Sequence, residues 1–114
     1  MSPAGSSPSR SIRMRYKTLW MPQAEAFIKS LPPEPRLALR QAIKKLAEGK
    51  TARLDLRTLE GQLHGYCRLR VRIYRVIYSV SATTHGPALT LVAAGPRSTI
   101  YEMFEKILAE QTPK

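Results

Sequence analysis

One stretch, from Tyr66 to Tyr78 (YCRLRVRIYRVIY), constrains the fold most, because strongly β-prone residues alternate in it with four arginines. Side chains alternate between the two faces of a strand. A single continuous strand would place Arg75 on the apolar face, where a buried charge needs a partner. A two-residue turn at Arg72-Ile73 instead pairs Arg70 with Arg75 and keeps Arg68 on the same face. The stretch therefore predicts a β-hairpin with a three-arginine face. Its opposite face is an apolar layer of Leu69, Val71, Tyr74, Val76 and Tyr78.

Periodicities on either side of the hairpin predict the remaining elements. These are a strand over 12–20, a short helix from Pro22 to Leu31, a second helix from about Glu34 to a glycine cap at Gly49, a loop over 51–64, a strand over 88–94 and a last helix from about Thr99 to Gln111. Thr99 and Glu102 match a capping box at the start of the last helix. The order is β-α-α-β-β-β-α. It predicts an α+β domain whose mainly antiparallel four-stranded sheet packs against helices.

The 114 residues are enough for one small domain with a single modest core. Residues 1–11, rich in Ser, Pro and Gly, are predicted to form a disordered tail, and residues 12–112 a single folded domain. No apolar run approaches the roughly 20 residues of a membrane span, and no secretory signal is visible at the N-terminus. With one cysteine, Cys67, no internal disulfide is possible, which fits a cytoplasmic location.

The charge indicates the kind of partner. Nineteen Lys and Arg against eight Asp and Glu give a formal net charge of +11. Such an excess favours polyanions such as nucleic acid or the ribosome, although a basic surface can also be inert. The concentration of arginines on one hairpin face favours a phosphate-binding function. Lys44 and Lys45, on the basic face of the second helix, could add to nucleic-acid binding, as could Arg72 at the turn.

Candidate chemistry is limited to arginine and tyrosine. His64 and His85 have no ligand-forming neighbours at metal spacing, and no nucleotide-binding glycine motif occurs, so we expect neither a metal nor a cofactor. Arg97 directly follows the last predicted strand, and Tyr101 lies in the first turn of the last helix. If that strand pairs beside the hairpin, both side chains reach the arginine face, where guanidinium groups can hold a phosphate bidentately.

These motifs resemble a known family. Leu59-Glu60-Gly61, the hairpin YCRLRV…YRVIY, and AGPR at 94–97 followed by Tyr101 are similar to the RelE branch of the RelE/ParE toxin superfamily, over about residues 14–108. The resemblance implies a metal-free endoribonuclease that cuts mRNA on the ribosome. Its partners would be a cognate antitoxin, the ribosome and mRNA, and operator DNA through the antitoxin complex alone; no membrane is involved.

The resemblance also implies a role for each site residue. The ribose 2′-OH attacks the adjacent phosphate and leaves a 2′,3′-cyclic phosphate. Tyr101 would be the general base, and Arg68 and Arg70 would stabilise its anionic form and the attacking oxygen. Arg75 would hold the phosphate in the transition state, and Arg97 would stabilise the leaving 5′-oxygen.

Two departures from the family pattern accompany the match. Arg68 and Arg70 stand where lysine is common, and arginine keeps the charge but does not readily exchange a proton. Arg72-Ile73 stands where relatives often have Gly-Asp, which leaves the type of turn open. Two other functions remain open: a ParE-like protein that inhibits DNA gyrase without nuclease activity, and an inactive or regulatory basic module that binds operator DNA with an antitoxin.

Overall fold

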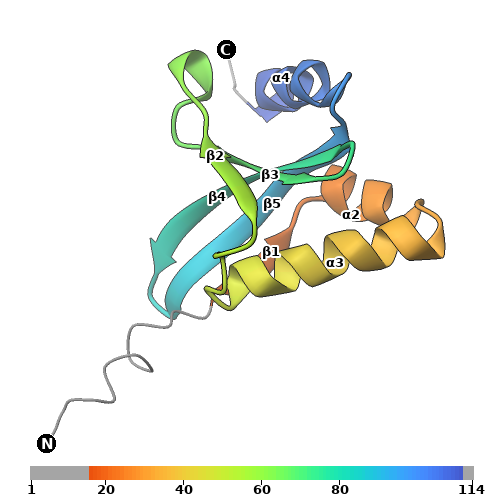
Figure 1. Ribbon diagram of the computed structural model, residues 1–114. Coiled ribbons are helices and arrows are strands. Elements are labelled where there is room, and N and C mark those ends of the chain that lie inside the picture. The colour runs from red at the N-terminus through yellow and green to blue at the C-terminus, as the bar shows by residue number, and fades with distance from the viewer. Residues whose placement is uncertain (1–15, 112–114) are drawn as a thin grey trace, which may run out of the picture.

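A mixed sheet of five strands runs through the protein in the order β1-β5-β4-β3-β2 (Figure 1). The strands are β1 (Lys17–Trp20), β2 (Asp55–Thr58), β3 (Cys67–Val71), β4 (Tyr74–Thr83) and β5 (Gly86–Pro96). The pair β1–β5 is parallel, and the other three pairs are antiparallel. This computed structural model describes residues 16–111, so the predicted tail over 1–11 and the start of the predicted first strand lie outside the described residues.

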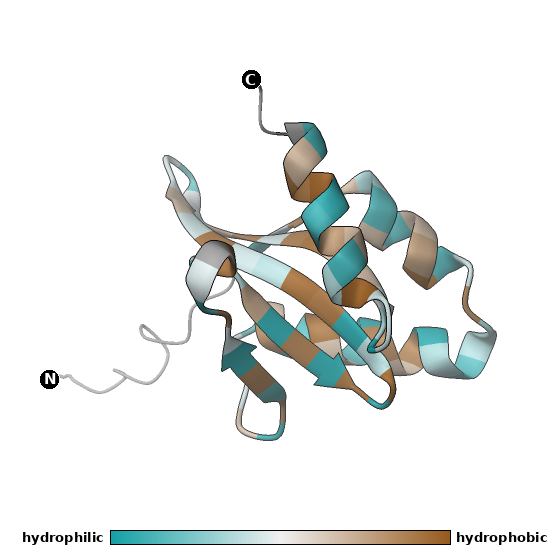
Figure 2. Cartoon of the chain, turned by 90° about the horizontal axis from the view of Figure 1, so that it is seen from above, coloured by the Kyte–Doolittle hydropathy of each residue, from teal (hydrophilic) through white to brown (hydrophobic). Residues whose placement is uncertain are grey.

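The hairpin has the register that its sequence predicts. Arg70 pairs with Arg75 and Leu69 with Val76 across a two-residue turn. Arg72 adopts a positive φ of 60° in this turn, a conformation that is uncommon for a residue with a side chain. The prediction of one arginine face and one apolar face is therefore confirmed, and the alternation of charged and apolar residues along the central strands is visible in Figure 2.

The predicted loop over 51–64 is wrong in part, and the sheet has five strands and not four. Residues 55–58 form β2, which pairs with β3 and places Asp55 opposite Arg70 and Arg57 opposite Arg68. Four residues with two charges carry little β-propensity of their own, so the pairing with β3 decides their conformation. A short 3-10 turn, η1 (Gly61–Leu63), follows within the rest of the predicted loop.

Three helices cover the sheet, as predicted. Helix α2 spans Pro22–Lys29 and α3 spans Pro33–Ala47, each beginning with a proline, which has no N–H to leave unpaired. Gly49 follows α3 with a φ of 78°, and the N–H of Lys50 bonds the carbonyl of Lys45 at 2.9 Å, which closes the helix end as expected. Helix α4 spans Ile100–Gln111, directly after Thr99 of the predicted capping box.

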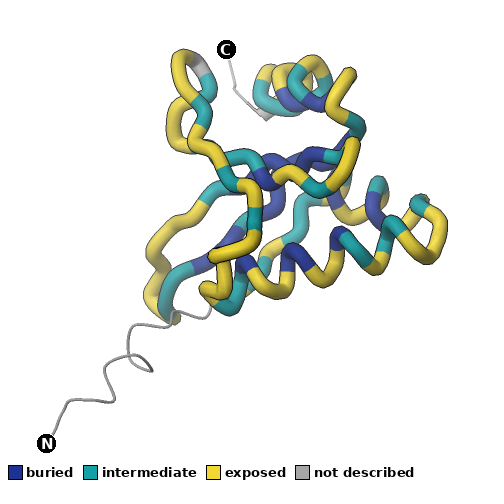
Figure 3. Tube along the Cα trace, in the orientation of Figure 1, coloured by how far each residue is buried: buried dark blue, intermediate teal, exposed yellow. Residues whose placement is uncertain are grey.

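The helices lie on opposite sides of the sheet (Figure 1). Helices α2 and α3 pack on the apolar side of the hairpin, around Ile28, Leu39, Leu69 and Leu91, whereas α4 packs on the arginine side around Ile77 and Phe104. Buried positions accordingly follow the centre of the sheet and the inner face of each helix (Figure 3). One sheet face is thus shared between the core under α4 and the arginines.

Two features bring α4 close to the sheet. Gly95 has no side chain where an added Cβ would lie 3.3 Å from Cε of Met103, so a larger residue would push against α4. At β5, the side chain of Gln23 from α2 makes the backbone hydrogen bonds that a neighbouring strand would otherwise make. It donates to the carbonyl of Ala94 and accepts from the Ala94 N–H, both at 2.8 Å. Its Nε2 also contacts Sδ of Met103 at 2.7 Å.

Candidate functional site

The arginine face, which we define as Arg68, Arg70 and Arg75, is assembled by strand register. Arg70 of β3 lies opposite Arg75 of β4, and Arg75 in turn lies opposite Gly95 of β5. Arg68 is two residues from Arg70 along β3 and therefore points to the same side. Three cations thus lie on the two neighbouring strands β3 and β4, beside the N-terminal end of α4. Neighbouring strands of a sheet are about 4.8 Å apart.

Arg75 is the central and most enclosed member of this face. It is only 7 % exposed, and its Nη1 donates to the carbonyls of Arg72 and Tyr74 at 3.0 Å each. These bonds fix the guanidinium under the turn and leave its other N–H groups directed elsewhere. Burial lowers the pKa of Arg75, and the charges of Arg70 and Arg68 lower it further. An anion bound here would relieve that repulsion.

Arg97 and Tyr101 join the arginine face from β5 and α4. The backbone N–H of Arg97 donates to the carbonyl of Ile73 at 2.8 Å, which ties the start of the β5–α4 connection to the hairpin turn. Arg97 repels the charge on Arg75, and the anionic form of Tyr101 attracts it, so both groups lie within electrostatic reach of Arg75. Tyr101 is half-buried, with its ring against the core under α4. The structure therefore brings together all five residues of the predicted catalytic set.

Arg68 is held differently from Arg70. Its side chain is 12 % exposed, and Nη2 bonds Oδ1 of Asp55 at 2.9 Å. Its Nε is buried and has no hydrogen-bond partner within residues 16–111. Arg70 is 49 % exposed, and its Nη1 lies 3.6 Å from Oδ2 of Asp55. One carboxylate therefore faces both arginines, and Arg68 keeps an unused donor.

Asp55 and Arg57 are functional candidates that the sequence analysis missed. Both point to the arginine side, because they pair with Arg70 and Arg68. The available signal was the alternation Asp-Leu-Arg-Thr around Leu56, a four-residue pattern with period two. So short a pattern does not distinguish a strand from a loop until its partner strand is known.

Three other predicted RNA-binding residues lie away from the arginine face. Arg72 points from the turn to α3 and forms a bidentate ion pair with Glu34, whose Oε1 lies 2.6 Å from Nη1. Lys44 and Lys45 belong to α3, on the opposite side of the sheet from α4. A contribution of these three residues to RNA binding stays a prediction.

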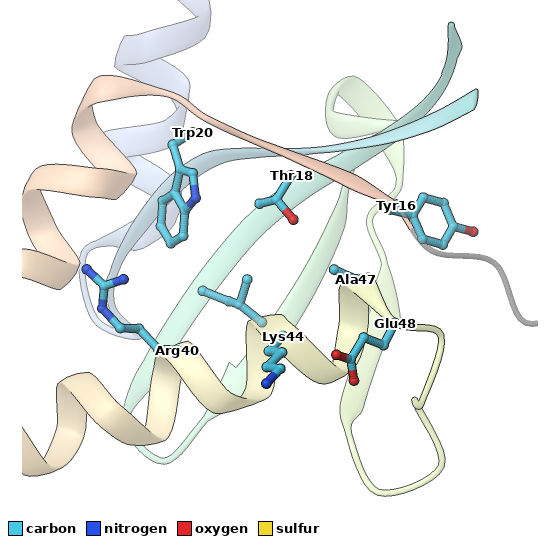
Figure 4. Close-up of a pocket in the computed structure, with 8 residues that line it drawn as sticks. Tyr16, Thr18, Trp20, Arg40, Lys44, Ala47 and Glu48 are labelled. Carbon is cyan, nitrogen blue, oxygen red and sulfur yellow. The ribbon is translucent and has the colours of Figure 1, made fainter. Parts of the chain in front are cut away.

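Lys44 borders a groove of about 360 Å³ between β1 and α3. Figure 4 shows Trp20 and Thr18 on the β1 side of this groove, with Arg40, Lys44 and Glu48 on the α3 side. The groove mixes aromatic, cationic and acidic groups. It is separated from the arginine face by the sheet itself, so any ligand there is not in contact with the predicted catalytic set.

Tyr78 and Cys67 lie together away from the arginine face. Tyr78 lies on the apolar side of β4, where burial, and secondly the neighbouring Cys67, raises the pKa of its phenol. Within residues 16–111, no three His, Cys, Asp or Glu side chains gather as metal ligands would. None of the described helices is both long and apolar enough to cross a bilayer.

Comparison with known proteins gives matches by structure alone, since no family model and no curated protein sequence matches the chain. A YoeB/ParE toxin from Agrobacterium tumefaciens superposes with a TM-score of 0.59 at 19 % identity, over 70 % of this chain and 97 % of that one. The archaeal RelE–RelB complex from Pyrococcus horikoshii gives 0.57 at 26 % identity, over 74 % and 97 % of the two chains. The toxin–antitoxin complex RelBE2 from Mycobacterium tuberculosis gives 0.55 at 19 %, over 75 % and 94 %.

Proposed function

We propose that this chain, which has the fold of the RelE/ParE toxins, is the toxin of a toxin–antitoxin pair and a ribosome-dependent endoribonuclease that cleaves mRNA in the cytoplasm. One observation carries the proposal: the buried Arg75 interacts electrostatically with Arg70, Arg68, Arg97 and Tyr101. Three cations and a phenol around one enclosed guanidinium form a site for a phosphate beside a group that can exchange a proton.

Phosphate binding follows from the charge of this site. Arg75 is held by two carbonyl bonds and needs little reorganisation to meet an oxyanion. Arg70, about half exposed, can turn towards the same phosphate once Asp55 releases it. A pentacoordinate phosphorane carries more negative charge than the ground-state diester, so fixed cations stabilise the transition state more than the substrate.

The reaction we propose is an internal transfer. The ribose 2′-oxygen forms a bond to phosphorus, the bond from phosphorus to the 5′-oxygen breaks, and a 2′,3′-cyclic phosphate remains. Tyr101 takes the 2′-OH proton as a phenolate, which Arg68 and Arg70 stabilise by their charge. Arg97 stabilises the leaving 5′-oxygen, which takes a proton from solvent. Arg68 and Arg70 act here by charge alone, because arginine does not give up a proton in this pH range.

A cognate antitoxin is the proposed partner of the free toxin. Two of the superposed structures are RelE–RelB and RelBE2 complexes, in which a toxin of this fold is bound to its antitoxin. An acidic antitoxin segment would complement the net charge of +11 and could cover the arginine face. Operator DNA would then be bound through the antitoxin complex.

The test is mRNA cleavage during translation in vitro, with 5′ ends mapped by primer extension in the presence and absence of ribosomes. We expect cuts on ribosome-bound mRNA, at least about 100-fold slower with Tyr101→Phe, since a general base typically contributes 100-fold or more. Tyr16→Phe is the matched control, because Tyr16 lines the groove between β1 and α3. Equal cleavage by wild type and Tyr101→Phe would refute the assigned base.

Inhibition of DNA gyrase is the second candidate, because the superposed Agrobacterium toxin is named for both YoeB and ParE. A ParE-like inhibitor would have no need of Arg97 and Tyr101 at the arginine face. A supercoiling assay separates the two functions: inhibition of supercoiling without any mRNA cleavage would replace the nuclease proposal by this one.

A further inference from the structure

Strand β2 enlarges the arginine face by one strand. The register places Arg57 directly opposite Arg68 and Asp55 directly opposite Arg70. Two rows of side chains therefore cross the sheet on the α4 side. One row contains Arg57, Arg68 and Ile77, and the other Asp55, Arg70 and Arg75. Arg57 occupies the corner of this array farthest from Arg75.

Arg57 and Arg68 differ in how free their charges are. Arg68 is nearly covered and already paired with Asp55, so only part of its donor capacity is available. Arg57 is exposed and forms no ion pair or side-chain hydrogen bond within residues 16–111. Asp55, which could have paired with Arg57, is occupied by the two arginines of β3. Arg57 is therefore an unneutralised cation at the open edge of the sheet.

The spacing assigns Arg57 to a different phosphate from the one at Arg75. Arg57 is on β2, which is two strand spacings, about 10 Å, across the sheet from β4 and its Arg75. A single phosphate held beside Arg75, Arg97 and Tyr101 is too distant to be the main ligand of Arg57. An extended RNA strand that crosses from β4 to β2 would bring a flanking phosphate to it.

We propose that Arg57 is a second phosphate-binding position, which holds a phosphate of the mRNA next to the one that reacts. The proposal rests on the proposed function and deepens it, because it adds a residue and a direction to the RNA path: from α4, across β4 and β3, to the edge at β2. Arg57 contributes affinity and not chemistry, since it acts equally on bound substrate and on the transition state.

The experiment is a salt titration of RNA binding to the full chain. The probe is a short single-stranded RNA that is fully 2′-O-methylated, which lacks the attacking hydroxyl and cannot be cut. Its affinity is measured by fluorescence anisotropy at several salt concentrations. Loss of one phosphate contact lowers the slope of log K against log salt by about 0.7 for a single strand. We expect that decrease for Arg57→Gln, with Arg57→Lys restoring the wild-type slope because it keeps the charge.

Arg53→Gln is the matched control. Arg53 is exposed and lies in the turn just before β2, away from the arginine face. Its replacement by glutamine removes one positive charge, as Arg57→Gln does. We expect it to leave the slope at the wild-type value. An unchanged slope in Arg57→Gln, or an equal decrease in Arg53→Gln, would overturn the proposal. The thermal unfolding of each variant shows whether the fold is intact, and Arg57→Lys tests the charge even if Arg57→Gln unfolds.

Cleavage on ribosomes separates this inference from the proposed function. Arg57→Gln should raise the half-saturating concentration of programmed ribosomes and leave the maximal rate unchanged. Tyr101→Phe should lower the maximal rate and leave the half-saturating concentration unchanged. If the wild type binds RNA with an Arg57-dependent slope but cleaves nothing, the nuclease proposal fails and the phosphate position stands. If the wild type cleaves mRNA on ribosomes but Arg57→Gln changes neither the slope nor the half-saturating concentration, the phosphate position fails and the nuclease proposal stands. If the wild type neither binds the RNA nor cleaves mRNA on ribosomes, both fail.

Discussion

Replacement of Gln23 by methionine tests the contact that joins α2, β5 and α4. The Gln23 amide makes two hydrogen bonds of 2.8 Å to the backbone of Ala94, and Ala94 is fully buried in the core. Methionine has a similar length and is apolar, so it preserves packing but satisfies neither group. The mutation therefore removes the two hydrogen bonds to Ala94, together with the contact of the amide with Sδ of Met103.

The expected cost is the penalty of two unsatisfied backbone groups. Leaving a buried donor or acceptor unpaired costs about 1–3 kcal/mol, so two such groups predict a loss of about 2–6 kcal/mol in the free energy of unfolding. Because the Gln23 side chain is itself half-buried, water can reach the site in part, and we expect the lower half of that range. A loss of about 2 kcal/mol is a large share of the roughly 5–15 kcal/mol that stabilises a domain.

The assay is equilibrium unfolding in urea, with Gln41→Met as control. Gln41 is exposed on α3, so its replacement exposes one more apolar side chain and breaks no buried bond. We expect a free energy of unfolding within about 0.5 kcal/mol of wild type for the control. A Gln23→Met protein as stable as the control would show that water, and not Gln23, satisfies Ala94, and the reasoning would be refuted.

Three further predictions concern charge and backbone conformation. Asp55→Asn removes the carboxylate that faces Arg68 and Arg70; RNA affinity should rise and the salt slope should steepen by about 0.7, and an unchanged slope would mean that Asp55 does not compete with RNA. The hydrogen bond from Arg72 holds the pKa of Glu34 below its ordinary value of 4.5. The stability that this contributes is present at neutral pH and lost as the pH falls through the folded-state pKa. In Glu34→Gln the free energy of unfolding should therefore decrease less steeply as the pH is lowered. The same decrease in wild type and variant would contradict the pairing. Gly49→Ala forces a side chain into a φ of 78° and should cost about 1–2 kcal/mol in urea unfolding, whereas a neutral effect would mean that the helix end rearranges.

The arginine hairpin illustrates what local pattern alone can predict. Alternation with period two, together with the cost of burying Arg75 on the apolar side, was sufficient to place the turn and to align Arg70 with Arg75. Prolines at the helix starts and the glycine after α3 marked the helix boundaries for similarly local reasons. These signals depend on backbone geometry within a few residues, so they can be interpreted without knowledge of the tertiary structure.

Strand β2 and its charged residues depended on contacts distant in sequence. Asp55–Thr58 is a strand because β3 offers it hydrogen bonds, and that pairing alone turns Asp55 and Arg57 towards the arginine face. The same holds for Arg72. Its ion pair with Glu34 forms because folding brings the hairpin turn next to the first turn of α3.

Periodicity and motif spacing are enough to predict the two faces of the hairpin, the helices and the five residues of the predicted catalytic set. The side of the sheet that α4 covers depends on the tertiary structure, and so does the presence of Arg97 and Tyr101 within electrostatic reach of Arg75. The tertiary structure also decided which arginines are neutralised by a carboxylate and which, like Arg57, are not. The physical reason is that periodicity is a property of neighbouring residues, whereas the electrostatic environment of a charge depends on every group that folding brings near it.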